Sequence, residues 1–324
     1  MSKPRSKLAD FAVYLGVRVV VCFLQVLSFR AASQAANILA WLAYHVDRRH
    51  RLVARDNLRY AFGDGDAAER DRLVRAVYRH FCTMLMEIIH LPRKLHPQNW
   101  KQHMTLLNHQ SIVDVLLSNR PVLVVSGHFG NWELGGYVLA LLGFRTHAIA
   151  RPLDNPYVDA FLRRFRESTG QKVLRKDGDF DKMQRVLASN GILLTLGDQD
   201  AGQKGQFVDF FGRPASTHKA VALLALEYKV PMLVLTSTRV SSSAAPPSSK
   251  LKGARKSIWR YQAEIADMIS PEEYKDRPDA VAALTQRFTT ALERMIRRYP
   301  EQYFWLHRRW KHQPKRRRKD KQAA

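Results

Sequence analysis

The stretch PVLVVSGHFGNWELGGYVLALLG, residues 121–143, changes its pattern half-way along. Residues 121–127 form a short apolar run, rich in β-branched side chains and closed by glycine, which is typical of a buried parallel strand. Residues 134–143 are expected to form a helix. A strand that leads directly into a helix begins a βαβ unit, and in such sheets ligands bind beyond the carboxyl ends of the strands. The polar turn at 128–133 is therefore a candidate site.

The same alternation continues along the chain. Apolar residues at three- and four-residue spacing predict a helix over 67–90, and residues 259–265 alternate as in a half-exposed strand near the sheet edge. Further strands are expected at 146–150, 171–174, 191–198 and 231–240, and further helices at 156–169, 179–189, 217–229 and 278–298. The predicted fold class is α/β, with a mostly parallel central sheet covered by helices.

The N-terminal region adds a hydrophobic helix to this fold. Fifteen of the 19 residues in 11–29 are apolar, close to the roughly 20 that a spanning helix needs. Arg18 lies within the run and makes insertion costly, so we expect a marginal spanning helix or an interfacial one. A buried core helix is the alternative, and a cleaved signal peptide is disfavoured because no small-residue cleavage site closes the run.

Three regions follow from these patterns. We expect a membrane-anchor or interfacial helical region over 1–46, an α/β domain over 47–310 and a disordered basic tail over 311–324. The Pro- and Ser-rich stretch 241–250 is predicted to be a flexible loop.

The net charge restricts the partners. Lys and Arg number 53 against 29 Asp and Glu, which gives +24 and calls for an anionic partner: nucleic acid, a membrane face or a phosphorylated substrate. No helix-turn-helix, RNP or zinc-finger signature accompanies the charge. Two cysteines support neither a disulfide framework nor a zinc site.

The turn after the first strand contains a possible acid–base pair. His128 lies between Gly127 and Gly130, Asn131 is a suitable N-cap, and Glu133 falls in the first turn of the helix. With His128 in the loop, the Glu133 carboxylate is expected to accept a hydrogen bond from one imidazole nitrogen and raise the basicity of the other. Such a pair can deprotonate an alcohol that attacks a thioester. The alternative is an ordinary surface or core histidine.

Several blocks together resemble a known family. GHFGNWE (127–133) resembles the H-x4-[DE] signature of the glycerolipid and lipid A acyltransferases, in the lauroyl and myristoyl lipid A branch of the lysophospholipid acyltransferase-like superfamily. Similar blocks follow in the same order at 150–159, 166–170, 197–227 and 300–311. The resemblance runs from about residue 10 to residue 311.

The resemblance implies an O-acyltransferase at the bacterial inner membrane, with the catalytic domain on the cytoplasmic face. The donor would be an acyl carrier protein or CoA thioester, and the acceptor a hydroxyl of a lipid A precursor or related glycolipid. No metal or other cofactor is implied. His128 and Glu133 would be catalytic, and the implied substrate-binding residues are Asn131, Arg151, Asn155, Arg166 and Asp198.

Two other functions remain open from the residues alone. Asp198 and Asp200 could hold a divalent metal in a glycosyltransferase, and the charge permits a nucleic-acid-binding protein. The aromatic residues Phe207, Phe210 and Phe211 are expected in a Gly-rich loop, lining an acyl channel, contacting the membrane or packing in the core. Acyl chain length, the choice of thioester and the oligomeric state are not determined by the sequence.

Overall fold

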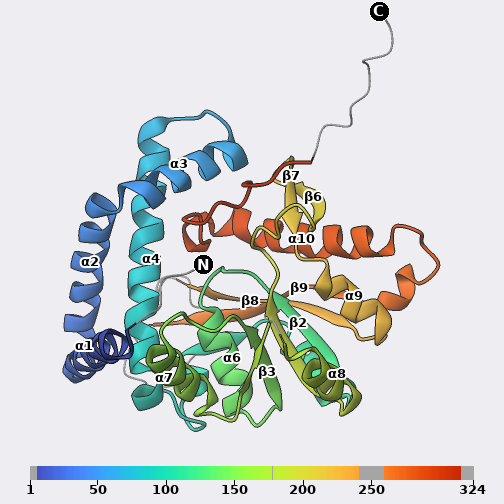
Figure 1. The fold of residues 1–324 in the computed structure, drawn as a ribbon, viewed down its shortest axis with the longest axis horizontal. Helices are drawn as coiled ribbons and strands as arrows, with labels where there is room; N and C mark the ends of the chain where they lie inside the picture. The colour runs from blue at the N-terminus through green and yellow to red at the C-terminus, as the bar shows by residue number, and fades with distance from the viewer. Residues whose placement is uncertain (1–5, 177, 241–258, 315–324) are drawn as a thin grey trace, which may run out of the picture.

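The computed structural model describes residues 6–176, 178–240 and 259–314 (Figure 1). The predicted loop at 241–250 lies outside the described residues, as does the predicted basic tail from residue 315 onward.

A seven-stranded sheet forms the centre of the molecule, in the order β1-β9-β8-β2-β5-β3-β4. The five strands from β8 to β4 run parallel, β9 is antiparallel to β8, and β1 is parallel to β9. The mostly parallel sheet is thus confirmed, and β9 is the second strand from one edge, as its alternating pattern predicted. The strands are β1 (Met104–Leu106), β2 (Val122–Ser126), β3 (Thr146–Ala150), β4 (Lys172–Arg175), β5 (Ile192–Leu196), β8 (Met232–Arg239) and β9 (Tyr261–Ile269).

Helices cover both faces of this sheet. One apolar cluster joins α5 and α6 to strands β2, β5 and β8, and a second joins α6 and α7. The main core lies on the opposite face under α8, α9 and α10. The helices are α5 (His109–Leu117), α6 (Trp132–Leu141), α7 (Pro156–Glu167), α8 (Phe180–Ala188), α9 (Ala220–Glu227) and α10 (Ala280–Arg298).

The connections leave β2 and β5 in opposite directions. The chain goes from β2 through α6 to β3, and from β5 through α9 to β8 on the other side of β2. Neighbouring strands with diverging connections leave a crevice at their carboxyl ends, which is where open α/β sheets bind ligands.

Four helices precede the sheet: α1 (Lys7–Val26), α2 (Phe29–Val46), α3 (Arg48–Phe62) and α4 (Ala67–Lys94). The predicted apolar segment therefore ends at Val26, and Ser28 caps a new helix. Among the described residues, α1 is the helix long and apolar enough to cross a membrane. Helix α2 lies along α4, with Tyr44 buried in the main core (Figure 1).

One predicted loop is regular structure instead. Strands β6 (Gln206–Phe210) and β7 (Arg213–Thr217) form an antiparallel hairpin, so the following helix begins at Ala220 rather than at residue 217. Phe210 and Phe211 are buried in the main core. Short 3-10 turns occupy η1 (Trp100–Gln102), η3 (Pro271–Tyr274) and η4 (Pro300–Gln302).

Candidate active site

His128 and Asp198 meet at the crevice between β2 and β5. Ser126 and Leu196 are paired across the two strands, so His128 and Asp198 each stand two residues beyond a strand end. The backbone N–H of His128 donates to Asp198 Oδ2 at 2.9 Å, and the ring Nδ1 lies 2.8 Å from Asp198 Oδ1. Because an ionised carboxylate can only accept, Nδ1 carries the hydrogen. In the neutral ring the lone pair is then on Nε2, which lies 3.4 Å from the side-chain nitrogen of Gln199.

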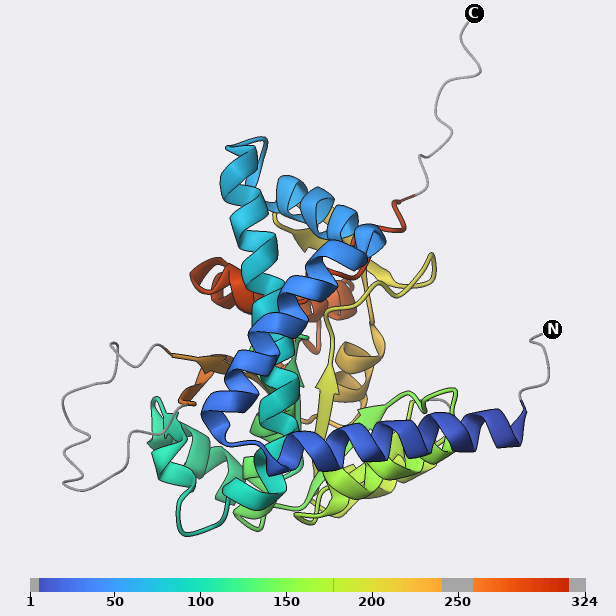
Figure 2. The same cartoon turned by 90° about the vertical axis from the view of Figure 1, so that its left-hand side faces the viewer.

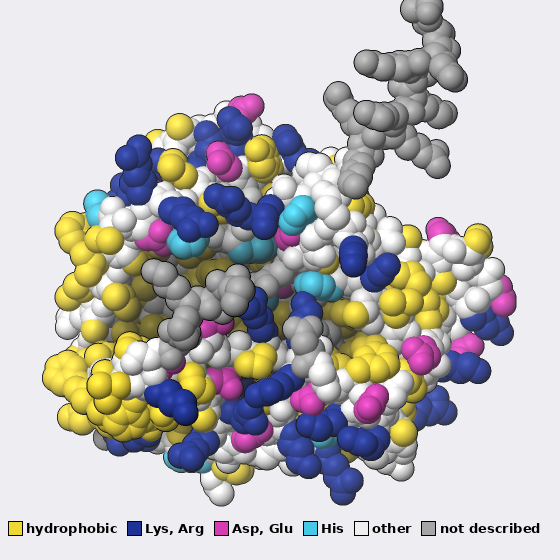
Figure 3. All heavy atoms as spheres, in the orientation of Figure 1, with side chains coloured by type: hydrophobic (Ala, Val, Ile, Leu, Met, Phe, Trp, Pro, Cys, Tyr) yellow, Lys and Arg dark blue, Asp and Glu magenta, His cyan; other side chains and the backbone are white. Residues whose placement is uncertain are grey.

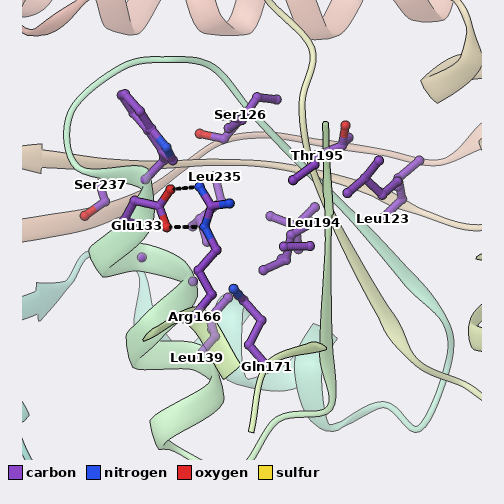
Figure 4. A pocket seen from close by; sticks show the side chains of 18 of the residues that line it. Leu123, Ser126, Glu133, Leu139, Arg166, Gln171, Leu194, Thr195, Leu235 and Ser237 are labelled. Carbon is purple, nitrogen blue, oxygen red and sulfur yellow. Dashed lines mark hydrogen bonds and ion pairs between the residues drawn. The ribbon is translucent and has the colours of Figure 1, made fainter. Parts of the chain in front are cut away.

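Glu133 has a different partner from the one expected. The sequence predicted a hydrogen bond between its carboxylate and the His128 ring, and this is wrong: Asp198 occupies that position. Glu133 instead accepts two hydrogen bonds from the Arg166 guanidinium, one from Nε at 2.9 Å and one from a terminal nitrogen (Figure 4). Glu133 lies in the first turn of α6, and α7 presents Arg166 to it. The pair is mostly buried, with side-chain exposures of 12% and 21%.

Asp198 remains ionised although it is buried. Burial by itself raises the pKa of a carboxyl group. The charge of His128 and its hydrogen bonds outweigh this effect and hold the pKa of Asp198 well below its usual range. A carboxylate that stays ionised can orient the imidazole and stabilise it when it takes up a proton.

Two glycines shape the loop around His128. A Cβ on Gly127 would lie 3.2 Å from Cγ of Asp198, so a side chain there would crowd the carboxylate. Gly130 has a φ of +63°, and a Cβ there would lie 1.9 Å from the carbonyl oxygen of Ser237. Gly130 is therefore required for the loop to approach Ser237, and Gly127 leaves room for the Asp198 carboxylate.

Asn131 is a structural residue in this arrangement. Its side chain caps α6 by accepting from the Leu134 N–H at 2.9 Å, which confirms the predicted N-cap. It is fully buried, and its amide nitrogen lies 3.4 Å from Oε2 of Glu87. Arg239 and Tyr261 also donate to that carboxylate oxygen. This buried network ties α4, β8 and β9 to the start of α6. It was not predicted, because its members are far apart along the chain.

The C-terminal block holds the other side of the loop. The Phe304 N–H donates to the carbonyl of His128 at 2.9 Å, and the Gly130 N–H donates to the carbonyl of Gln302 at 3.0 Å. The rings of Trp132 and Phe304 flank the imidazole, with centroids 5.1 and 6.2 Å from it. These contacts were not predicted, although the C-terminal block was singled out by resemblance.

A large cavity opens beside His128. It has a volume of about 1350 Å³, and His128, Glu133 and Arg166 are among the residues that line it. Figure 4 shows the Glu133–Arg166 pair on one side, with Leu194 and Leu123 facing it across the cavity. Most of the wall is apolar, including Ile112, Leu116, Val124, Val138, Leu139, Leu142, Phe144, Leu194, Leu196, Val221, Leu224 and Leu235. Such a space suits a long hydrocarbon chain.

The other predicted site residues have separate places. Arg151 lines the cavity and is exposed. Asn155 caps α7 and donates to the Asp10 carbonyl at 2.8 Å, so it joins α7 to α1. Asp200 lines the cavity but is paired with Nδ1 of His312 at 2.6 Å. None of the three phenylalanines of the β6–β7 hairpin is among the cavity-lining residues in the described part of the chain.

A metal site was one of the open alternatives for this region. Within residues 6–176, 178–240 and 259–314, no group of three or more His, Cys, Asp or Glu side chains is arranged to hold a metal ion. Asp198 and Asp200 each have a histidine partner instead.

Comparison with known proteins identifies the family. A family model described as bacterial lipid A biosynthesis acyltransferase matches residues 1–312. The chain belongs to this family. Among curated relatives, the lipid A biosynthesis palmitoleoyltransferase of Escherichia coli K12 is 26% identical over 274 residues, covering 82% of this chain and 80% of the relative. The lipid A biosynthesis lauroyltransferase of the same strain is 25% identical over 285 residues, covering 85% and 84%.

A lipid A biosynthesis acyltransferase of Haemophilus influenzae is similar at 24% identity over 282 residues, covering 85% of this chain and 82% of the relative. This lipid A acyltransferase family member is therefore an enzyme that transfers acyl groups, and the resemblance drawn from the sequence blocks is confirmed. Membership of this family disfavours the glycosyltransferase and nucleic-acid-binding alternatives.

Proposed function

We propose that this acyltransferase moves a fatty acyl chain from an acyl carrier protein or CoA thioester to a hydroxyl of a lipid A precursor or related glycolipid. The observation that carries the proposal is a histidine with a buried carboxylate partner at the wall of a large apolar cavity. The names of the relatives, a palmitoleoyltransferase and a lauroyltransferase, support an acyl chain as the transferred group.

His128 acts as the general base in this proposal, oriented by Asp198 rather than by Glu133. The acceptor hydroxyl gives its proton to Nε2 while its oxygen attacks the thioester carbonyl carbon. The carbon–oxygen bond forms and the carbon–sulfur bond breaks. The proton on Nε2 then passes to the departing thiolate, which leaves as a thiol. The side-chain nitrogen of Gln199, 3.4 Å from Nε2, marks the position that the hydroxyl would take.

We propose that the Arg166 guanidinium binds the oxygen of the thioester carbonyl, and that Glu133 holds the guanidinium in position. Two of the five guanidinium N–H groups are engaged by Glu133, which leaves the others for a substrate. In Figure 4 the remaining terminal nitrogen faces the cavity. A fixed positive group at that place would stabilise the oxyanion that forms as the hydroxyl attacks.

Basic groups at the cavity fit a phosphorylated substrate. Arg151 and Lys176 line it, and Lys176 Nζ lies 3.1 Å from Nε2 of His218. The neighbouring ion pairs join other residues: Arg163 to Asp159, Arg166 to Glu133 and Lys182 to Asp179. We propose that these side chains bind a phosphate of the acceptor or of the carrier's phosphopantetheine, since cationic side chains are the usual partners of phosphate.

The proposed location is the inner membrane of a bacterium, with the α/β domain on the cytoplasmic face. The apolar helix α1 supports the membrane location. Lys3, Arg5 and Lys7 at its start favour the cytoplasmic side, because Lys and Arg close to an apolar helix are enriched there. An anionic membrane face would also attract the basic surface.

Lipid analysis of a deletion strain tests the function. We expect lipid A that lacks one acyl chain, restored by the natural gene and not by a His128→Ala variant that is expressed and folded. Unchanged lipid A in the deletion strain would contradict the acceptor assignment. Purified enzyme given each thioester in turn would then identify the donor.

The proposed step takes its proton acceptor from the chain itself. We therefore expect full transfer in the presence of excess chelator. A strict loss that one divalent metal restored would contradict this part of the proposal.

A further inference from the structure

Helix α1 is attached to the α/β domain along its side. Its neighbour is α7, and the two helices run next to each other in Figure 2, where α1 is the dark blue helix. Phe11 and Tyr14 contact the ring of Tyr157, with centroids 5.4 and 6.1 Å away, and Arg18 lies over the ring of Phe161 at 5.0 Å. The attachment therefore extends over about two turns of α1.

The C-terminal end of α1 is also held. Gln25 donates to the carbonyl of Ile89 at 3.0 Å, and Arg93 donates to the carbonyl of Gln25 at 3.2 Å. Both partners lie near the end of α4. Together with the bond from Asn155 to the Asp10 carbonyl, these contacts fix α1 at both ends against the domain.

The two sides of α1 differ in character. At 100° per residue, the positions that meet the domain (10, 14, 18 and 25) lie on one side, and positions 8, 15, 19 and 26 lie on the other. The second set is Leu8, Leu15, Val19 and Val26, with exposures of 81, 47, 68 and 79%. We call these four residues the apolar face of α1. Helix α2 continues this surface with exposed Ile38, Trp41, Leu42 and Val46, and Figure 3 shows apolar side chains gathered on this part of the molecule.

The packing of α1 against α7 restricts how α1 can be oriented in a membrane. If α1 crossed the bilayer while docked, α7 would enter the hydrocarbon beside it. Helix α7 carries charged side chains from its first turn to its last, namely Asp159, Arg163, Arg164, Arg166 and Glu167. Charged groups are strongly disfavoured at that depth, and Arg166 is engaged with Glu133 at the cavity.

We propose that α1 lies in the plane of the membrane surface, with its apolar face in the lipid and its opposite side on α7, and that it does not cross the bilayer. The proposal rests on the membrane location given under the proposed function. Arg18, which makes a spanning helix costly, is directed toward Phe161 on the domain side in this arrangement. Interfacial helices place their apolar side about 5–10 Å into the headgroup and acyl boundary.

This placement also accounts for access to the cavity. Leu162 and Arg166 of α7 line the cavity, as does Leu153 just before it, which is 44% exposed. With α1 in the interface, the cavity wall lies about one helix diameter, roughly 10–12 Å, from the lipid. A lipid acceptor then reaches His128 from the side without leaving the bilayer.

Depth measurements along α1 test the proposal. In a chain carrying Cys22→Ser and Cys82→Ala, single cysteines replace Leu8, Val19 or Val26 and receive a fluorescent label in vesicles of anionic and zwitterionic phospholipid. Quenchers placed at known depths on the acyl chains then report each position. An in-plane helix gives the same shallow depth for all three labels. A spanning helix separates residues 8 and 26 by about 27 Å along the membrane normal, which would overturn the proposal.

A sidedness measurement gives an independent result. Single cysteines at Ser6 and Ser118, both exposed, are treated with a membrane-impermeant maleimide in sealed inverted membrane vesicles. We expect both to react from the same side, because Ser6 begins α1 and Ser118 lies in the α/β domain. Reaction from opposite sides would overturn the proposal, as would three α1 labels that no lipid quencher reaches, which would indicate a second copy of the chain on the apolar face.

Acyl transfer is measured on the same labelled proteins. If transfer is lost while the label depths stay the same, only the proposed reaction is contradicted. If transfer is unchanged while the depths are those of a spanning helix, only the in-plane proposal is contradicted.

Discussion

Asp198 receives two hydrogen bonds from a single residue, His128, one from the backbone N–H and one from the ring. Two bonds to one carboxylate fix both the main chain and the side chain of the histidine. The carboxylate itself is buried, with a side-chain exposure of 2%. Any change to Asp198 should therefore alter the tautomer and the direction of the imidazole together.

Replacing Asp198 by Asn should remove most of the activity while leaving the fold intact. The amide can donate to Nδ1 and so favour the tautomer with its hydrogen on Nε2, which cannot accept the acceptor's proton. We expect kcat to fall by about 10³–10⁴-fold, as when the carboxylate of other catalytic triads is changed to an amide. Combining the change with His128→Ala should cost little more than either alone. Asp114→Asn, on an exposed helix position, is the matched control, and normal turnover by Asp198→Asn would contradict the assignment.

The Glu133–Arg166 pair should behave as one unit. Glu133→Gln loses the charge that holds the guanidinium, and Arg166→Lys loses its two-point geometry. We expect each to lower kcat by at least about 100-fold and the double variant to fall by far less than the product of the two losses. Exposed Arg164→Lys on the same helix serves as the control. Strictly multiplicative losses would show that the two residues act separately.

The contribution of Asp198 to the free energy of unfolding should decrease as the pH is lowered. Its pKa in the folded chain lies below the ordinary value of 3.8, so the ionised group stabilises the native state at pH values above 3.8. This contribution is lost as the pH falls below 3.8 toward the folded-state pKa. Urea unfolding of the natural chain and of Asp198→Asn should therefore show a difference in free energy that is larger at pH 5 than near pH 3. A difference that grew on acidification would contradict this sign.

The stability of variants at position 131 should depend on the charge of the new side chain. Asn131→Ser keeps a cap for α6 and should cost about 1 kcal/mol or less. Asn131→Asp also keeps a cap but places a carboxylate beside the buried Glu87, whose pKa burial already raises. We expect a clearly lower melting temperature for the aspartate variant than for the serine variant, measured by circular dichroism. The opposite order would exclude contact with Glu87 as the reason for the asparagine.

The cavity wall should determine which acyl chains are accepted. Leu194 faces the cavity from β5, and Leu194→Phe adds volume there (Figure 4). We expect kcat/KM for the longest good donor to fall by about tenfold or more, with shorter chains affected less, because one methylene in such a pocket is worth a factor of roughly 10–200. Competition between thioesters of different length measures this. Equal loss for all lengths would show that Leu194 does not contact the chain.

Much of the fold was predictable because its signals are local. Short apolar runs, of which 121–127 is rich in β-branched residues and closed by glycine, located the five parallel strands, and helices between them followed from the alternation along the chain. The strand β1 and the helix α5 were missed because 104–117 carries little periodicity. The hairpin β6–β7 was missed because its glycines and polar residues were taken to indicate a loop, whereas its aromatic side chains Phe210 and Phe211 are part of the core.

The sequence allowed most residues of the site to be predicted, but not which of them are hydrogen-bonded to each other. Asp198 was expected at the carboxyl edge of a strand, and so was His128. Their contact depends on β2 and β5 being neighbours, which is set by the order of strands in the sheet and leaves no mark on the spacing along either segment. Glu133 was paired with His128 because it was near in sequence. Arg166 was named as substrate-binding from the family resemblance alone, and no local pattern placed α7 beside α6.

The backbone bonds between the His128 loop and the C-terminal block have a consequence for synthesis of the protein. The loop is made early, but the carbonyl of Gln302 and the N–H of Phe304 that complete it are added almost at the end. A growing chain therefore exposes its apolar N-terminal helices first and acquires a finished His128 loop last. We expect that an incomplete chain that stops before residue 302 reaches the membrane without gaining activity, so that the reaction is withheld until translation is nearly complete.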